Sequence, residues 1–590
     1  KTKSQESYQE EAVKSATVAG EQGGYYDAKH DLVLEGVNVV STGKVTLQGK
    51  NISLKPLETT YWKEVKEKNQ GFSGIIWNGG VSVSYGTDKK SQKDTQKTQN
   101  ISEITSGKTL TIAAEETLTG SSVNLYGREG IRVTGEEGIH LSTAKNTREV
   151  QQKQSSTRVG ANIGVKSEIK NTFENLRNPK SLIDTQGNVY GVINTASKLT
   201  GAIKDGAKVT NSIISKKYEE KADSVKSSNL EGISTNWKDY LSAGVSLTKK
   251  KAESRNYQEE VVQNQMESEG NIVLSFKQGS ISLEGTEIKA PKDAKLLAKE
   301  KVEVRAAEQK NAFSSSSSQR GAGLDMNGSL TASASGQKGR GEGASYVNSH
   351  IQAGGDYQVH AKEILHEGAN VKAGTIHMKG EKILVASKQD TSHQKDSSYG
   401  GSLSFSVNPK VALNSVQLSA RKGKGAWVNE QTSLLAEHGG EIVAEHLENR
   451  GAIFASESET NQLKIRAHHL EVHDLEDSHH DENRGGGVSL SSKVPNISVS
   501  HDKIEKEQKT RATAVNTEFV IAGEEKKAEE LGFNTELSKA QEISKEKEKH
   551  LNAQLHTDLL GKDKQEELQR AGKVLQDVQC AAINEEKAKG

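Results

Sequence analysis

The sequence has 590 residues, with 79 Lys plus Arg against 79 Asp plus Glu, a formal net charge of zero and a single cysteine. These counts exclude a disulfide-stapled scaffold and a cysteine-rich zinc module, and they argue against a nucleic-acid binder that relies on a basic surface. Hydrophobic residues make up only 32% of the chain and aromatic residues 4%. That is too little for a large globular enzyme core, but enough for a repeat fold whose units share a thin core.

The N-terminus has neither a methionine nor an apolar signal core, and no apolar run reaches eighteen residues. The sequence therefore reads as an interior piece of a longer protein, without a membrane-spanning helix.

Short segments that alternate apolar and polar residues, set off by glycine or asparagine, recur along the chain. They are Val45–Leu47, Ile52–Leu54, Leu110–Ile112, Ile131–Val133, Ile139–Leu141, Ile272–Leu274, Ile281–Leu283, Val302–Val304 and Leu463–Ile465. Period-two alternation predicts strands with one inward and one outward face. Strands this short do not form separate sheets, but they stack as rungs of a parallel β-solenoid, with glycine at the tight corners.

A longer period of roughly 80 residues lies over these rungs. Polar tracts recur next to glycine-led strands of small residues; the tracts are Lys90–Gln99, Glu149–Arg158, Gln309–Arg320, Lys388–Ser398 and Asp474–Arg484. Each unit is predicted to be several rungs plus a projecting β-hairpin. Strands such as Leu403–Val407 and Val488–Leu490 also resemble membrane hairpins in their alternation. Such arms are shorter than the roughly 9–11 residues that span a bilayer, unless neighbouring residues extend them.

Two regions depart from the strand pattern. Residues 167–240, with Phe173, Leu176 and Leu182, predict short amphipathic helices inserted at a hairpin tip. Residues 505–590 are rich in glutamate and lysine, and Leu551, Leu555 and Leu559 at intervals of four predict a helical tail. The expected organisation is a repeat solenoid over 1–166 and 241–504, interrupted by the insertion and followed by a charged helical region.

Two sets of residues are candidates for sites of chemistry. One set is histidines and aspartates near one hairpin: His468, His469, His473, Asp474, Asp477, His479, His480 and Asp481. Because neighbouring residues on a strand point to opposite faces, a polar hairpin stem is favoured over a metal site. The other set is the carboxylate pairs Glu115–Glu116 and Glu136–Glu137, which suit a glycan-active β-helix enzyme only if they converge. Neither pattern is strong, so we predict no catalysis, no metal and no cofactor.

The four tryptophans lie near predicted hairpins and not within rungs. Trp62, Trp77, Trp237 and Trp427 are therefore candidates for contact with a membrane interface or a partner. The alternative is that they plug the ends of a thin core.

Several stretches carry a resemblance to a known family. They are Gly138–Thr147 running into Gln151–Ser156, Ala306–Ser318 followed by Gly321–Gly323, and Gly532–Glu542. Together they resemble the large exoproteins of two-partner secretion, the filamentous haemagglutinin-like adhesins and contact-dependent growth inhibition effectors. The best match is the haemagglutinin-repeat part that precedes the C-terminal effector.

The resemblance implies a non-enzymatic segment of a protein secreted to the surface of a Gram-negative bacterium. Its implied partners are an outer-membrane two-partner-secretion transporter, the outer membrane or a receptor of a target cell, and an immunity protein for a downstream toxin, with no nucleic acid. The implied function is to present a C-terminal toxin and help deliver it to neighbouring bacteria. The alternative is an adhesin shaft for host cells or biofilm, and a glycan-active enzyme is the third hypothesis.

Overall fold

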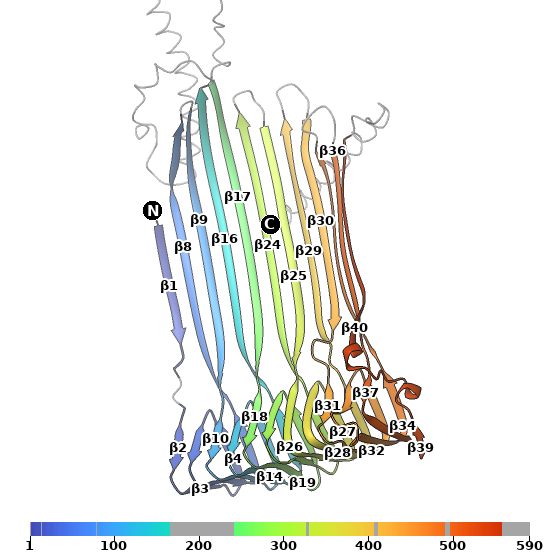
Figure 1. Cartoon of the computed structure of the whole chain (residues 1–590). Coiled ribbons are helices and arrows are strands. Elements are labelled where there is room, and N and C mark those ends of the chain that lie inside the picture. The colour runs from blue at the N-terminus through green and yellow to red at the C-terminus, as the bar shows by residue number, and fades with distance from the viewer. Residues whose placement is uncertain are drawn as a thin grey trace, which may run out of the picture.

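The computed structural model describes residues 2–12, 15–77, 80–165, 241–325, 330–405, 411–489 and 496–556. Its strands form two sheets that run side by side along the molecule (Figure 1). One is a coiled parallel sheet of short strands at the base. The other is an antiparallel sheet of long strands that stands on it.

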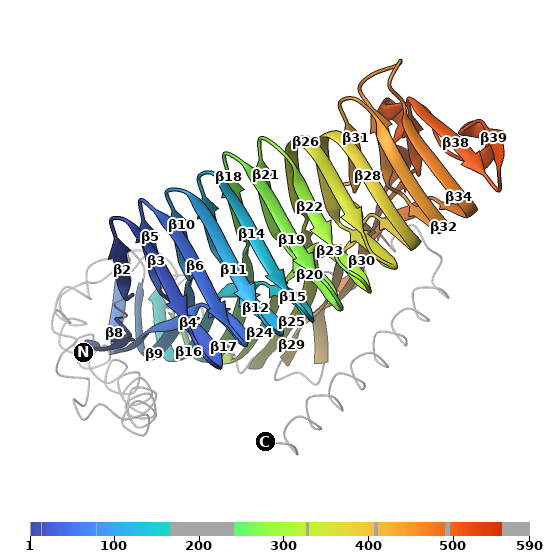
Figure 2. The same ribbon diagram turned by 90° about the horizontal axis from the view of Figure 1, so that it is seen from below.

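The parallel sheet is a three-sided solenoid, seen from below in Figure 2. The first side holds β2 (Thr17–Gly20), β5 (Asn38–Ser41), β10 (Glu103–Ser106), β13 (Asn124–Gly127), β18 (Asn264–Ser268), β21 (Thr286–Ala290), β31 (Ser433–Ala436), β33 (Ile453–Ser456) and β37 (Thr513–Val515). The second holds β3 (Gly23–Asp27), β6 (Lys44–Gly49), β11 (Thr109–Ala114), β14 (Gly130–Gly135), β19 (Asn271–Phe276), β22 (Ala294–Leu297) and β38 (Thr517–Ile521).

The third side holds β4 (Asp31–Glu35), β7 (Asn51–Lys55), β12 (Thr117–Ser121), β15 (Gly138–Ser142), β20 (Ser280–Glu284), β23 (Lys301–Arg305) and β27 (Glu363–Glu367). Four longer strands turn a corner and belong to two or three sides: β26 (Ser349–His360), β28 (Ala369–Ala386), β32 (Gly440–Arg450) and β34 (Leu463–His473). The sequence therefore predicted the solenoid correctly.

Like residues stack between coils because the parallel register repeats. Leu110 lies beside Ile131, and Ile281 beside Val302, so one coil takes about 21 residues. The inward side chains are Val, Leu and Ile with almost no exposed surface, as at Leu47. Each coil thus shares its thin core with its neighbours, which suits a chain of low hydrophobic content.

The corner between the third and first sides shows a regularity of its own. Where one coil passes directly into the next, a residue with positive φ makes the turn: Gly36 (58°), Ser122 (50°), Gly285 (50°), Gly368 (64°) and Gly451 (56°). Glycine adopts this left-handed conformation without a steric penalty. At the alternate coils the chain leaves the corner and enters a long strand instead.

These long strands build the antiparallel sheet. In spatial order they are β1 (Thr2–Glu10), β8 (Leu57–Trp77), β9 (Gly80–Asn100), β16 (Ala144–Val165), β17 (Leu241–Val262), β24 (Ala307–Asp325), β25 (Leu330–Val347), β29 (Asp390–Phe405), β30 (Val411–Trp427), β35 (Leu475–Ser489), β36 (Asn496–Thr510) and β40 (Gln541–His556). The expected hairpins exist, but they are not separate spurs, because each one pairs with the next into a single sheet.

The spacing of coils explains this continuity. Neighbouring strands in any sheet lie about 4.8 Å apart. Two coils advance the solenoid by two such steps, and one hairpin adds two strands to the antiparallel sheet. One hairpin for every two coils therefore keeps both sheets growing at the same rate along a common axis.

The structure corrects the expected arm length. From β8 to β36 the strands of the antiparallel sheet run for 15 to 22 residues, well beyond the short arms expected. The polar tracts are the cause of the error. Lys90–Gln99, for example, lies within β9 and is not a separate polar tract beside it. A strand exposed on both faces carries no apolar alternation, so its pattern looks like a loop.

The predicted helical tail is wrong over 505–556. Leu551 and Leu555 lie in β40, which pairs antiparallel with β36 along its length. A spacing of four satisfies a period of two as well as a helix, and pairing to an existing strand overrides helix propensity. The rest of that tail and the helical insertion predicted at 167–240 lie outside the described residues.

A short cap closes the C-terminal end of the solenoid. It contains β39 (Glu524–Lys526) and the 3-10 turns Glu529–Leu531 and Leu537–Lys539. Phe533 stacks on Phe519 with ring centroids 5.0 Å apart and lies 6.1 Å from Phe454. These rings cover the apolar core where the last coil would otherwise leave it open.

Candidate functional surface

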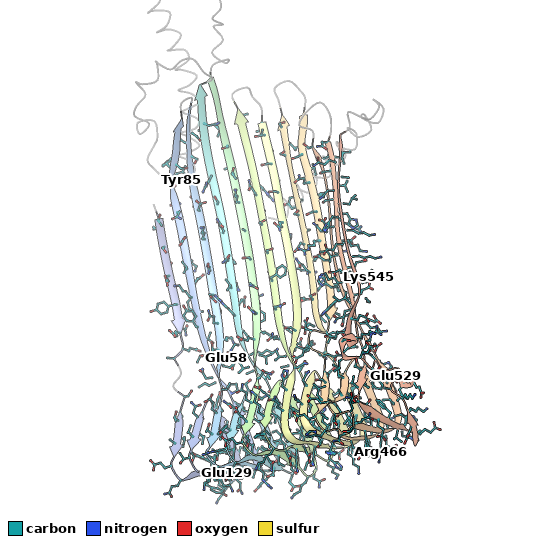
Figure 3. The ribbon with its side chains drawn as sticks, viewed as in Figure 1. Glu58, Tyr85, Glu129, Arg466, Glu529 and Lys545 are labelled. Carbon is teal, nitrogen blue, oxygen red and sulfur yellow. The ribbon has the colours of Figure 1, made fainter. Side chains whose placement is uncertain are left out.

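The antiparallel sheet is a single layer. Among the described side chains of β9, from Ser82 to Asn100, none is buried, and Figure 3 shows side chains projecting from both faces of the sheet. A soluble antiparallel sheet normally covers one of its faces with a core. Here both faces are available for contact, and the two faces carry different side chains.

Charged residues dominate the half of the sheet near the solenoid. Arg148 bonds Asp94 across strands at 2.7 Å, and Arg255 Nε lies 2.5 Å from Glu149 Oε1. The Arg255 guanidinium lowers the pKa of Glu149 below its usual range, helped by the Gln151 amide. Exposed ion pairs of this kind individually contribute little to stability. They do, however, link neighbouring strands in the register that the sheet adopts.

The half of the sheet away from the solenoid changes character. Tyr85 lies in this half, whereas Glu58 lies at the base of the sheet (Figure 3). Side chains directly opposite each other in an antiparallel pair share one face. One such row crosses the sheet through residues that are nearly all apolar: Phe72, Tyr85, Val159, Leu247, Ala322, Ala332 and Leu403. The rings of Phe72 and Tyr85 lie 4.8 Å apart, which places both on the same face.

Further apolar rows lie on the same face, two residues away along each strand. The next row outward is Val83, Ala161, Val245, Leu324 and Leu330. Two rows on the inner side are apolar only toward the C-terminal strands, one with Val416, Val488 and Ile497 and the other with Tyr399, Leu418 and Val499. We call these four rows the apolar band.

The opposite face carries serine, threonine and glycine at the intervening positions. Ser73 and Ser84 hydroxyls lie 2.7 Å apart, and so do those of Ser398 and Ser419. Gly160, Gly321 and Gly323 lie beside Ser246, Ser333 and Thr331. The distal sheet is therefore amphipathic, with one apolar face and one face of small polar groups.

Most of the apolar band is exposed, although Val416 is buried. Leu247 is 48%, Leu324 51% and Leu418 53% exposed, with Phe72, Leu330, Tyr399 and Val499 between 40% and 47%. Soluble proteins rarely leave a contiguous apolar patch of this kind in water, and such patches mark sites of interaction. Alternation was visible in the sequence, but the rows were not, because they depend on the register between strands.

The predicted histidine cluster is divided between the two sheets. His468, His469 and His473 lie on β34 of the solenoid, whereas His479 and His480 lie on β35 of the antiparallel sheet. Asp477 is buried at the base of that sheet, where it accepts hydrogen bonds from the Val428 N–H and the Thr510 hydroxyl.

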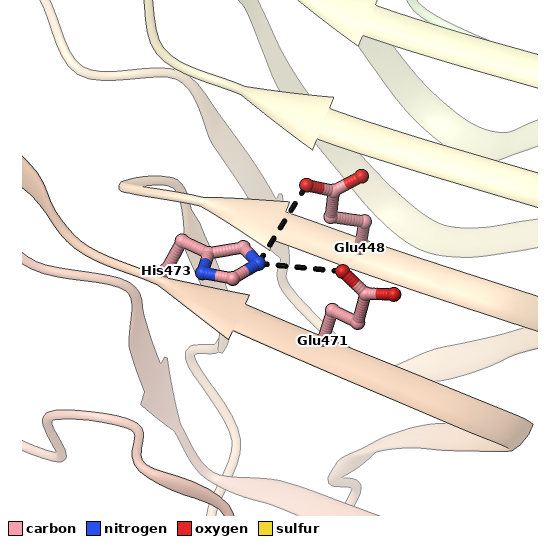
Figure 4. A group of neighbouring side chains, drawn as sticks. All are labelled: Glu448, Glu471 and His473. Carbon is pink, nitrogen blue, oxygen red and sulfur yellow. Dashed lines mark hydrogen bonds and ion pairs between the residues drawn. The ribbon is translucent and has the colours of Figure 1, made fainter.

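Within the described residues, one group of possible metal ligands remains (Figure 4). His473 Nε2 lies 3.4 Å from Glu471 and 3.8 Å from Glu448 on the neighbouring coil. These three residues could offer one imidazole nitrogen and two carboxylates. Glu448, however, already bonds the Arg450 guanidinium, which competes with a cation for the same oxygen.

A family model described as "Hemagglutinin repeat" matches residues 83–199 and 245–401. The matched segments cover most of the first six hairpin strands after β8 and the coils between them. Residues 83–199 and 245–401 are therefore hemagglutinin repeats. This confirms the resemblance to filamentous haemagglutinin-like exoproteins of contact-dependent growth inhibition.

Several curated relatives are similar to this chain over most of its length. "Toxin CdiA" of Yersinia pestis is 24% identical over 492 residues, covering 78% of this chain and 14% of the relative. "tRNA nuclease CdiA" of Escherichia coli strain NC101 is 25% identical over 79% of this chain and 14% of its own length. "Deoxyribonuclease CdiA" of Yersinia pseudotuberculosis is 25% identical over 78% and 44%. The chain thus spans less than half the length of each of these relatives. No solved structure matches it.

Of the four candidate tryptophans, the structure describes the side chains of Trp62 and Trp427, which lie on β8 and β30 and do not meet. Trp62 lies on the charged half of β8, where its indole N–H donates to Gln9 at 3.1 Å and Lys93 lies 5.6 Å above the ring. Trp427 ends β30 at the base of the sheet and is half-buried. Trp77 is the last residue of β8, and Trp237 is outside the described residues. Their contact with a membrane or partner stays a prediction.

The carboxylate pairs weighed for catalysis lie at exposed corners of the coils. Glu116 pairs with Lys50 at 3.0 Å, and Glu136 with Lys277 at 2.9 Å. Each carboxylate is thus held by a lysine of an adjacent coil. Among the described residues, no helix is long and apolar enough to span a membrane.

Proposed function

We propose that this region presents a C-terminal toxin at the surface of a Gram-negative bacterium and helps deliver it to a neighbouring cell. In this proposal, an outer-membrane two-partner-secretion transporter exports the parent protein. The target is the outer membrane of the neighbour or a receptor in it, and an immunity protein protects the producer. The similarity to proteins named as CdiA toxins and nucleases supports this role.

The apolar band is the observation that carries the proposal. Its alternation of apolar with serine or glycine matches strands that face lipid on one side. Leu247, Leu324 and Leu418 are about half exposed. Moving each of them into an apolar phase therefore yields on the order of 1 kcal/mol, about half the value for a fully exposed leucine. Several such residues in register are enough to hold the sheet on a membrane after contact.

Vesicle flotation tests the proposal. The full chain is mixed with outer-membrane vesicles and, separately, with epithelial membranes, and bound protein is quantified after flotation. We expect binding to the bacterial vesicles, and a decrease of about tenfold for Leu247→Glu. Ser246→Glu is the matched control, since it adds the same charge to the same strand on the polar face.

Two outcomes would reject the proposal. Equal binding by both variants would show that the apolar band does not make the contact. Binding to epithelial membranes alone would favour the adhesin shaft instead. Circular dichroism of each variant verifies that the strands are retained.

A further inference from the structure

Before the protein reaches a target membrane, the apolar band is exposed to water, which is unfavourable for apolar side chains. A secreted protein that leaves so much apolar surface wet is prone to association. We propose that in water the band is covered by the same band of a second copy of this chain, packed face to face. This inference rests on the proposed function, because it concerns the state of the same surface before delivery.

The area of the band is sufficient for a stable pair. Two of its rows cross the eight strands from β8 to β30, and two more cross the four strands from β29 to β36. With strands about 4.8 Å apart and rows about 6.8 Å apart, the band covers on the order of 800 Å² on each copy. Stable interfaces between proteins bury roughly 800 Å² per partner.

The surface shape of the band is complementary to itself in a two-fold dimer. Ala322 and Ala332 leave a shallow hollow in the middle of one row, and Leu324 and Leu330 form a ridge in the middle of the next. When two copies face each other with their solenoids pointing in opposite directions, the order of the rows is reversed. The ridge of each copy then lies over the hollow of the other, as in the interdigitated core of a β-sandwich.

The position of the band permits this arrangement. The band lies on the half of the sheet away from the solenoid, and the strands extend for up to 22 residues from the base. Two copies can therefore overlap their distal halves while the solenoids stay far apart. A two-fold, self-complementary contact of this kind closes on itself and does not extend into a fibre.

Sedimentation velocity tests the pair in the absence of lipid. We expect the full chain to sediment as a dimer at micromolar concentration, and Ala332→Glu to shift it to a monomer. Ser333→Glu is the matched control, because this neighbouring residue lies on the polar face and is exposed. Leu330→Ser is a second test, which lowers the ridge without adding charge and should weaken dimerisation at least tenfold.

A wild-type chain that stays monomeric across this range, or two glutamate variants that behave alike, would overturn the pair. The proposed function fails separately. A monomer that floats with outer-membrane vesicles retains the delivery proposal and rejects the pair. If the chain is a dimer that Ala332→Glu dissociates, but it never floats with vesicles, the dimer proposal is retained and membrane contact is rejected.

Discussion

The solenoid and the antiparallel sheet use the same backbone ladders but are stabilised differently. In the solenoid, Leu110 and Ile131 stack in a closed core and are essentially unexposed. In the distal sheet, Leu247 occupies a well-paired strand yet remains half exposed. Hydrogen-bonded pairing alone thus fixes the shape of the sheet, while burial of apolar surface stabilises the solenoid. The sheet depends on the solenoid to hold its strands at the right spacing.

The strongest test of this dependence changes the ratio of coils to hairpins. Deleting β28 (Ala369–Ala386) removes one coil. Two neighbouring hairpins then arise from three coils, whereas the normal ratio of one hairpin for every two coils requires four. We expect loss of hydrogen-exchange protection in the strands around β25 and β29, because their spacing no longer matches the solenoid.

Deleting a whole unit, residues 307–389, is the control. It removes two coils with one hairpin and leaves the ratio unchanged. Protection of the remaining sheet should then be retained. If the single-coil deletion leaves the sheet equally protected, the sheet does not depend on the coil spacing.

The second test compares equivalent truncations in the two regions. Leu125 stacks between Ile104 and Met266 and has no exposed surface. Leu125→Ala should lower the free energy of local opening by about 2–5 kcal/mol, the usual cost of a core cavity. Leu247→Ala in the sheet should cost less than about 1 kcal/mol, since half of that side chain is already in water. Native-state hydrogen exchange measures both, and similar losses would contradict the comparison.

The third test uses a titratable pair that only the solenoid buries. His366 Nε2 lies 2.8 Å from the Tyr357 hydroxyl, and both side chains are fully buried. Burial lowers the pKa of His366 to about 4. Below the ordinary histidine pKa near 6.5, His366 is protonated in the unfolded chain but stays neutral in the folded chain. Stability should therefore fall as the pH drops from about 6.5 to 4, by at most roughly 3 kcal/mol.

Denaturant unfolding at several pH values measures this term. His366→Gln keeps a polar partner near Tyr357 but does not titrate. The difference in stability between wild type and variant should therefore change across that pH window. A difference that is constant with pH would show that the protonation of His366 does not affect folding.

The smallest effect is expected on the charged half of the sheet. Arg255 and Glu149 pair across β17 and β16, with the arginine largely exposed. A double-mutant cycle with Arg255→Gln and Glu149→Gln should yield a coupling of about 0.2–1 kcal/mol, reduced by salt. A much larger coupling would mean that ion pairs, and not backbone pairing, hold this half together.

Much of the base was predictable from residues alone. Alternation at segments such as Val45–Leu47 fixed the rungs, because inward apolar positions repeat at a constant interval and only a stack buries them. The hairpins and their repeat of roughly 80 residues were also visible. The strand character of residues 541–556 was not, because glutamate and lysine favour a helix until a paired strand such as β36 is available.

The sequence by itself determined the solenoid, its corners at residues such as Gly285 and Gly368, and its family. Only the tertiary structure decided that the hairpins merge into one sheet and that their apolar residues align on one face. The reason is physical. The amino-acid sequence encodes the periodicity along a strand, whereas the register between strands 80 residues apart is set by the spacing of the coils that carry them. Phe72, Leu247 and Leu403 share a row only because the solenoid places their strands side by side.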